Sequence, residues 1–228
     1  VPIVAERYGS PGGRRVLVIG VIHGNEDAGT AIVDELRGTG APDGVELWLV
    51  ESMNPDYCKD TSNTTLNFHN GKVLSAWYNA GRVYALDPLT LETAGEQDFC
   101  GGLDTPMNAH GKTDPRTGEF INYGYADFQP WLTYYVISAD GKVRHRARID
   151  LPGPRLPHDT TITPNYTILH DFPLFHDLDV LKRTGHRVVQ FKRDLPTRFG
   201  VIPRYGTQEQ VRWFEFEPGY VLHMVNAW

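Results

Sequence analysis

The chain has 228 residues, enough to bury a hydrophobic core in one or two domains, and its formal net charge is −6. It has no Lys/Arg-rich run, so we expect no nucleic-acid partner, because nonspecific phosphate binding needs clustered cations. The apolar runs are too short for a transmembrane segment, and no signal segment is recognisable. The two cysteines, Cys58 and Cys100, have neither a disulfide nor a zinc-ribbon spacing, which makes a cytoplasmic location the default expectation.

The first 56 residues predict a short strand–helix–strand unit. Val16–Ile22 and Val45–Val50 are continuous apolar runs, as expected of buried strands. Thr30–Arg37 between them has helical character, and a strand–helix–strand crossover predicts that the two strands pair in parallel. The helix residues expected to pack on these strands are Ile32, Val33 and Leu36.

The remainder, residues 57–228, is rich in short strand-like runs. Ala139–Lys142 (Ala-Asp-Gly-Lys) is a strong hairpin-turn signal between two of them. Short strands joined by Gly, Asp and Pro turns are typical of a sandwich, barrel or propeller, so the predicted fold is mainly β. The predicted strands are Lys72–Ala76, Val83–Leu86, Phe120–Tyr125, Thr133–Ser138, Lys142–Ile149, Tyr166–His170, Arg187–Phe191, Gly200–Pro203, Val211–Phe216 and Tyr220–Val225.

Three widely separated histidines are the main candidates for a functional site. His110, His158 and His223 each lie near the end of a strand-like run. Neutral imidazoles that converge in space can bind Fe, Cu or Zn and leave coordination positions open for chemistry. We therefore expect the three rings to meet at one point, carried by neighbouring inner strands. His170 is the main competitor of His158 and is interpreted as structural or rim-lining. Four further histidines are interpreted as turn or surface residues: His69, His145, His176 and His186.

From about Tyr57 to Trp228 the chain resembles the carotenoid and stilbene cleavage oxygenases, the family that includes the retinal-pigment-epithelium isomerase. The resemblance lies in a series of segments in the family's order. These are Asn63–Thr65 with Phe68–Lys72, Tyr84–Pro88 with Leu91–Thr93, the His110 box Ala109–Pro115 with Thr117–Glu119, His158–Asp159 with Ile162–Tyr166, Gly200–Gly206, and the His223 box Tyr220–Trp228.

This resemblance implies a seven-bladed β-propeller, of which residues 57–228 would supply about three blades, with iron on the axis. It assigns His110, His158 and His223 as Fe(II) ligands, and the fourth histidine of the family has no counterpart here. Asn79 would stand where relatives carry a glutamate bonded to a ligand imidazole. The implied reaction cleaves an alkene C=C bond of a carotenoid, apocarotenoid or stilbene with O2 to give two carbonyl products. Aromatics that could line a substrate tunnel, or equally the core, are Phe128, Trp131, Tyr134, Tyr135, Phe172 and Phe175.

Residues 1–56 resemble a different family, the start of a zinc carboxypeptidase. His23 and Glu26 form a His-x-x-Glu pair directly after a strand, and Asn54–Asp56 is an Asn-Pro-Asp turn. The resemblance implies zinc at His23 and Glu26. Catalytic zinc needs three protein ligands and a water, and no third ligand, general base or arginine pair of that family is recognisable after Pro55. Peptidase activity is therefore not expected.

Three hypotheses remain open: an iron oxygenase or a portion of one, a zinc carboxypeptidase relative, and a non-catalytic truncated or fused chain. The start at Val1 and the end at Trp228 within the Asn-Ala-Trp box predict a fragment. Open edges of an incomplete propeller predict marginal stability or self-association. With three of four imidazoles present, the chain loaded with Fe(II) is expected to cleave alkenes little or not at all.

Overall fold

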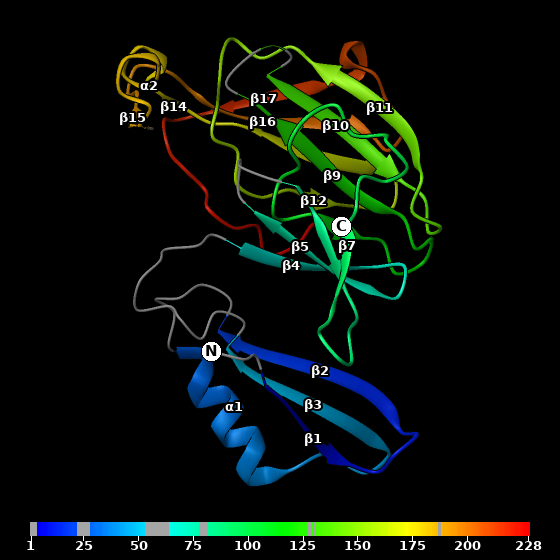
Figure 1. Cartoon of the computed structure of the whole chain (residues 1–228). Helices are drawn as coiled ribbons and strands as arrows, with labels where there is room; N and C mark the ends of the chain where they lie inside the picture. The colour runs from blue at the N-terminus through cyan, green and yellow to red at the C-terminus, as the bar shows by residue number, and fades with distance from the viewer. Residues whose placement is uncertain are drawn as a thin grey trace.

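The computed structural model describes residues 4–21, 28–52, 64–77, 82–126, 129, 131–186 and 188–228. These residues are mainly β, as predicted, and are drawn in Figure 1 with the first three strands and the long helix below the strand-rich remainder. Neither α-helix among the described residues is long and apolar enough to cross a membrane.

The N-terminal unit is a three-stranded sheet covered by one helix. Its elements are β1 (Ala5–Gly9), β2 (Arg14–Val21), α1 (Ala28–Thr39) and β3 (Val45–Ser52), and the strand order is β1-β3-β2. β2 pairs with β3 in parallel, which confirms the predicted crossover, and β1 adds an antiparallel edge.

The helix packs on this sheet along one stripe. Val33 is fully buried against Leu47 and Leu49, with Leu36 partly buried beside it. The stripe begins at Gly29, where a Cβ atom would lie 1.7 Å from the carbonyl oxygen of Gly20, so helix and sheet touch backbone to backbone. Ile32 is 59% exposed, so its predicted packing is wrong.

The first of three four-stranded antiparallel sheets among the described residues is a simple meander. It contains β4 (Thr64–His69), β5 (Lys72–Trp77), β6 (Tyr84–Leu86) and β7 (Thr93–Glu96), paired in chain order. The predicted strands at Lys72–Ala76 and Val83–Leu86 correspond to β5 and β6.

The second sheet is also paired in chain order and is the best-buried part of the chain. It contains β8 (Lys112–Thr113), β9 (Phe120–Tyr125), β10 (Leu132–Ile137) and β11 (Val143–Ile149). All residues of β9 and β10 are buried. The Ala139–Lys142 turn joins β10 to β11, as predicted.

The third sheet has the order β12-β13-β16-β17. Its strands are β12 (Thr161–Ile162), β13 (Tyr166–Asp171), β16 (Thr197–Pro203) and β17 (Arg212–Phe216), all antiparallel. A short 3-10 helix at Gln208–Gln210 connects the last two strands.

An excursion between β13 and β16 carries a small two-stranded sheet and a helix. β14 (Leu174–His176) pairs with β15 (Val189–Phe191), and α2 (Leu178–Thr184) lies between them in sequence. The helix is capped by the Asp177 side chain at its start and by Gly185 in the left-handed conformation at its end. No residue of α2 is buried, and the helix was not predicted from the sequence.

Alternate residues of β10 face two different cores, because successive strand side chains point to opposite faces. Tyr134 belongs to a core shared with Leu169 of β13 and Ile202 of β16. Its neighbour Tyr135 belongs to a second core shared with Leu74 of β5. The second sheet is therefore packed between the first and the third, and all three are held together by buried aromatic and aliphatic side chains.

The predicted strand at Tyr220–Val225 is wrong, since the chain from Gly219 to Trp228 is without regular structure. Its polar contacts explain this difference. The backbone N–H of Met224 donates to the Asp159 carboxylate at 2.8 Å, and the Tyr220 hydroxyl donates to the carbonyl oxygen of Leu156 at 3.0 Å. These bonds tether the segment through side chains rather than through a strand ladder.

Candidate metal centre

His110, His158 and His223 converge, as predicted. One potential ligand atom from each ring lies within 4.8 Å of those of the other two. The Nε2 atoms of His110 and His158 are 3.0 Å apart, and the His223 ring centroid lies 4.9 Å and 5.0 Å from the centroids of the other two rings. The three imidazoles therefore form one compact cluster of nitrogen donors.

The cluster is carried by connecting segments, so the prediction that inner strands carry the ligands is wrong. His110 lies just before β8, His158 lies before β12, and His223 follows β17. A single parallel bridge pairs His110 with Asp159, which brings the first two segments together. The site thus forms where segments that enter or leave the second and third sheets meet.

Buried asparagines hold the segment that carries His110. The side-chain amide of Asn67 on β4 donates to the carbonyl oxygen of Ala109 at 2.7 Å, and that of Asn122 on β9 donates to the Asn108 carbonyl oxygen at 2.8 Å. The Asn108 side chain in turn accepts from the backbone N–H of His110 at 2.8 Å. Because each amide satisfies a buried backbone group, this segment keeps a fixed conformation without being a strand.

The environment of His110 favours the neutral imidazole that a metal requires. Burial lowers its pKa to about 3, with further contributions from nearby His158, Lys112 and His223, against the opposing influence of Asp159. His110 is therefore uncharged at neutral pH, and its ring offers a nitrogen lone pair to a metal ion.

Asp159, next to His158, is a buried carboxylate with partners on several segments. Lys112 donates to its Oδ1 at 2.5 Å, and the backbone N–H of Met224 donates to its Oδ2. Burial opposes ionisation of this carboxyl, but the hydrogen bonds and the Lys112 charge outweigh it, so the pKa of Asp159 lies below its ordinary value. This residue was not singled out at the sequence level.

The donor set fits a transition-metal ion such as iron. Two nitrogens that each lie about 2.1 Å from one ion at a right angle are about 3.0 Å apart. The 3.0 Å separation of the His110 and His158 Nε2 atoms matches that value. Three neutral imidazoles without a thiolate suit iron, copper or zinc and leave positions open for other ligands.

The remaining histidines lie outside this cluster among the described residues. His170 is fully buried, stacks on Phe172 at a centroid distance of 4.5 Å, and has no hydrogen-bond partner for either ring nitrogen in the described part of the chain. Burial lowers the pKa of His170 to about 4. His69 is 4% exposed and stacks on Phe120, and His176 is 7% exposed, so the surface interpretation of these two is wrong.

The residues of the zinc hypothesis, His23 and Glu26, lie outside the described residues, as does Asn79. Their expected roles stay predictions.

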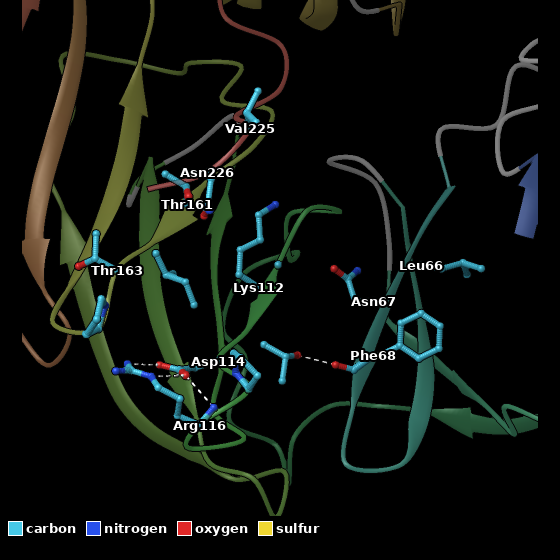
Figure 2. Close-up of a pocket in the computed structure, with 15 residues that line it drawn as sticks. Leu66, Asn67, Phe68, Lys112, Asp114, Arg116, Thr161, Thr163, Val225 and Asn226 are labelled. Carbon is cyan, nitrogen blue, oxygen red and sulfur yellow. Dashed lines mark hydrogen bonds and ion pairs between the residues drawn. The ribbon is translucent and has the colours of Figure 1, made fainter. Parts of the chain in front are cut away.

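An open cavity of about 690 Å³ is lined by residues close in sequence to His110 and His223, including Lys112 and Val225 (Figure 2). Lys112, Asp114 and Arg116 line it from β8 and the turn after it, Phe68 lines it from β4, and Asn226 lines it from the C-terminal segment. Its lining mixes these polar and charged side chains with apolar ones such as Leu66, Ile162 and Val225, and it contains none of the aromatics proposed for a tunnel. Of those aromatics, Tyr134, Tyr135 and Phe172 are core residues with at most 1% of their surface exposed, and Trp131 packs against the core. The Phe175 ring lies under the Arg155 guanidinium. Phe128 is outside the described residues.

The family model described as "Retinal pigment epithelial membrane protein" matches residues 17–228. The chain belongs to this family. This match confirms the resemblance of residues 57–228 to the carotenoid and stilbene cleavage oxygenases, and it begins inside the block ascribed to a zinc carboxypeptidase. The family match gives the zinc carboxypeptidase resemblance no support.

Three oxygenases are among the curated relatives of this family member. "Carotenoid 9,10(9',10')-cleavage dioxygenase" of Crocus sativus is 38% identical over 180 residues, which cover 77% of this chain and 33% of that protein. "Isoeugenol monooxygenase" of Pseudomonas nitroreducens is 35% identical and covers 75% of this chain and 36% of its own. "Resveratrol cleavage oxygenase 1" of Aspergillus fumigatus is 35% identical, with 75% and 35% covered. The chain thus spans about a third of the length of these relatives.

Solved structures of the family agree with the fold. The lignostilbene dioxygenase of Pseudomonas brassicacearum matches with a TM-score of 0.61 and 31% identity, covering 82% of this chain and 39% of that one. A mutant of Synechocystis apocarotenoid oxygenase matches with a TM-score of 0.59 and 25% identity, covering 70% and 35%.

Proposed function

We propose that this chain is part of a non-heme Fe(II) dioxygenase that cleaves an alkene C=C bond into two carbonyl products. The observation that carries the proposal is the convergence of three imidazoles in a member of this family. The proposed substrates are carotenoids, apocarotenoids or stilbenes together with O2, in line with the names of the relatives.

In this proposal the three four-stranded sheets act as about three blades of a seven-bladed propeller, with the histidine cluster toward its axis. Their shared cores support the arrangement, because the second sheet packs against the first on one face and the third on the other. The rest of the propeller and a fourth imidazole would have to be present for full activity.

Bound iron would activate O2, because a closed-shell alkene cannot do so alone. The described residues contribute position and charge. His110, His158 and His223 hold the ion as neutral ligands, so its positive charge is not reduced by an anionic ligand. The buried asparagines and Asp159 fix the segments that carry these rings.

The test is metal reconstitution of the chain and of a His158→Ala variant. After anaerobic loading with Fe(II) and desalting, we expect the parent chain to retain iron and the variant to lose at least about tenfold in affinity, because removing even a group that only orients a metal ligand typically costs about 10–100-fold. Equal iron retention by both would contradict the proposed site. A zinc-selective chain would favour the carboxypeptidase alternative, and substoichiometric metal of either kind would favour a non-catalytic chain.

Two expectations about the isolated chain stay predictions. With stilbene or apocarotenoid as substrate, the iron-loaded chain should form little or no carbonyl product, and turnover that His158→Ala abolishes would show that three imidazoles suffice. Self-association is also expected, because β17 is an edge strand whose Phe214 and Phe216 side chains are more than half exposed. Sedimentation velocity at several protein concentrations would reveal it.

A further inference from the structure

We propose that Asp159 is the positioning residue that holds the three histidine segments in register, so that its carboxylate sets the metal affinity of the cluster. This inference rests on the proposed function, because it assigns a residue that acts through the three proposed ligands. The Asp159 carboxylate bonds to Lys112, two residues after His110, and to Met224, directly after His223.

The carboxylate of Asp159 uses its two oxygens for different segments. Oδ1 accepts from the Lys112 ammonium at 2.5 Å and from the backbone N–H of Thr160 at 2.7 Å. Oδ2 accepts from the backbone N–H of Met224 at 2.8 Å. Lys112 is two residues after His110, and Met224 directly follows His223. One side chain therefore joins the segments of all three histidines.

The backbone of Asp159 completes this link. It pairs with His110 in the isolated parallel bridge, and its carbonyl oxygen accepts from the Tyr123 hydroxyl at 3.0 Å. Tyr123 is fully buried in the core between the second and third sheets. The Asp159 side chain is 3% exposed, so water competes little for its bonds. The positions of the histidines are thereby tied to the packed core.

Asp171 shows that this arrangement is specific and is not a general property of buried aspartates in this chain. It is equally buried and bonds two cations, with Arg155 Nε at 2.6 Å and Arg198 Nε at 2.7 Å. Neither arginine lies within two residues of a site histidine. Asp171 thus provides an equally buried carboxylate that is also paired with cations but lacks the link to the cluster.

An asparagine at position 159 would break the link in a defined way. Its single carbonyl oxygen can replace Oδ1, which keeps the acceptor for Lys112 and Thr160. Its NH2 group then faces the N–H of Met224, and two donors cannot bond. Turning the amide over would restore the Met224 bond and set the NH2 group against Lys112. Either way one histidine segment is released while the side-chain volume stays the same.

The experiment is a Co(II) titration of the whole chain, followed by visible absorption, on the parent, Asp159→Asn and Asp171→Asn. We expect the dissociation constant to rise about tenfold or more in Asp159→Asn, the range seen when groups that orient metal ligands are removed. We expect less than about a threefold change in Asp171→Asn, even where both variants lose thermal stability. Lys112→Met removes the other arm of the link and should weaken binding in the same direction.

A second readout needs no metal. Hydrogen exchange of residues 220–226 in the metal-free chain should speed up in Asp159→Asn, because the Met224 amide loses its acceptor, and should stay unchanged in Asp171→Asn. Unchanged Co(II) affinity in Asp159→Asn, or an equal loss in both variants, would overturn the positioning role. The failure of the proposed site looks different: in that case His223→Ala would bind Co(II) as well as the parent chain does.

Discussion

Replacing Arg204 with methionine should destabilise the chain substantially, because this arginine is a buried tie between the second and third sheets. Its side chain is 7% exposed, and its guanidinium donates to Asp114 at 3.1 Å, to Glu119 at 3.1 Å and to the Thr163 carbonyl oxygen at 2.6 Å. Methionine preserves most of the volume and removes all three bonds.

The expected loss is about 3 kcal/mol of unfolding free energy, the lower end of the range for breaking a buried ion pair. The lower end applies because Asp114 keeps a second cation: Arg116 still donates to it at 3.0 Å and 3.3 Å. The assay is urea unfolding followed by tryptophan fluorescence. Arg148→Met is the matched control, since Arg148 is 69% exposed and lies 3.8 Å from Asp104, where an ion pair contributes little.

The loss of unfolding free energy caused by Arg204→Met should also depend on pH. Hydrogen bonds from Arg116, aided by Arg204, hold the pKa of Asp114 well below its ordinary value. A carboxyl with a lowered folded-state pKa stabilises the fold above its unfolded value of about 4 and loses that contribution as the pH falls below it. The difference between parent and Arg204→Met should therefore be full at pH 7 and shrink below about pH 4. A loss no larger than that of the Arg148→Met control, or one independent of pH, would refute this reasoning.

Three further substitutions, one of them with a control, test buried contacts. Val33→Ala should lower the unfolding free energy by about 2–3 kcal/mol, because it removes fully buried methyl groups. Ile32→Ala on the same helix should change it by less than about 0.5 kcal/mol. Equal effects of the two substitutions in chemical denaturation would contradict the buried stripe described for α1. Gly124→Ala should cost about 1–3 kcal/mol, because the new Cβ would lie 1.9 Å from the Thr105 hydroxyl oxygen, and a melting temperature equal to that of the parent would show that the strand can shift. Tyr134→Phe should cost about 1–3 kcal/mol by leaving a buried carbonyl oxygen and a buried hydroxyl without their partner, as thermal unfolding would measure.

Local pattern predicted the elements whose stability comes from their own residues. The parallel pair β2 and β3 was predictable because both strands are continuous apolar runs around an amphipathic helix. β1 was missed, because Ala5–Gly9 is short and its strand conformation depends on pairing with β3. Helix α2 was also missed, although Asp177 and Gly185 are recognisable capping residues.

Family context predicted which histidines meet, and physical pattern alone would not have done so. Nothing in the periodicity around His223 distinguishes a strand from the irregular segment that the structure shows, because the contact that decides it is made with Asp159, 65 residues from Met224. Asp159 was named only within the His158–Asp159 segment of the family resemblance, and its role was missed for the same reason. Its role depends on three distant segments, and a single buried aspartate beside a histidine has no local signature.

The distances along the chain between the ligands give the cluster a further property. His110 and His158 are 48 residues apart, and His223 lies a further 65 residues along the chain. An ion bound to all three rings would close two long loops, and in the unfolded chain the entropy cost of that closure would leave the same histidines with little affinity. Bound metal would then favour the folded state in proportion to the logarithm of its concentration over the dissociation constant. Metal affinity therefore depends on whether the sheets have assembled. A chelator should lower the unfolding temperature of the metal-bound chain even where no catalysis takes place.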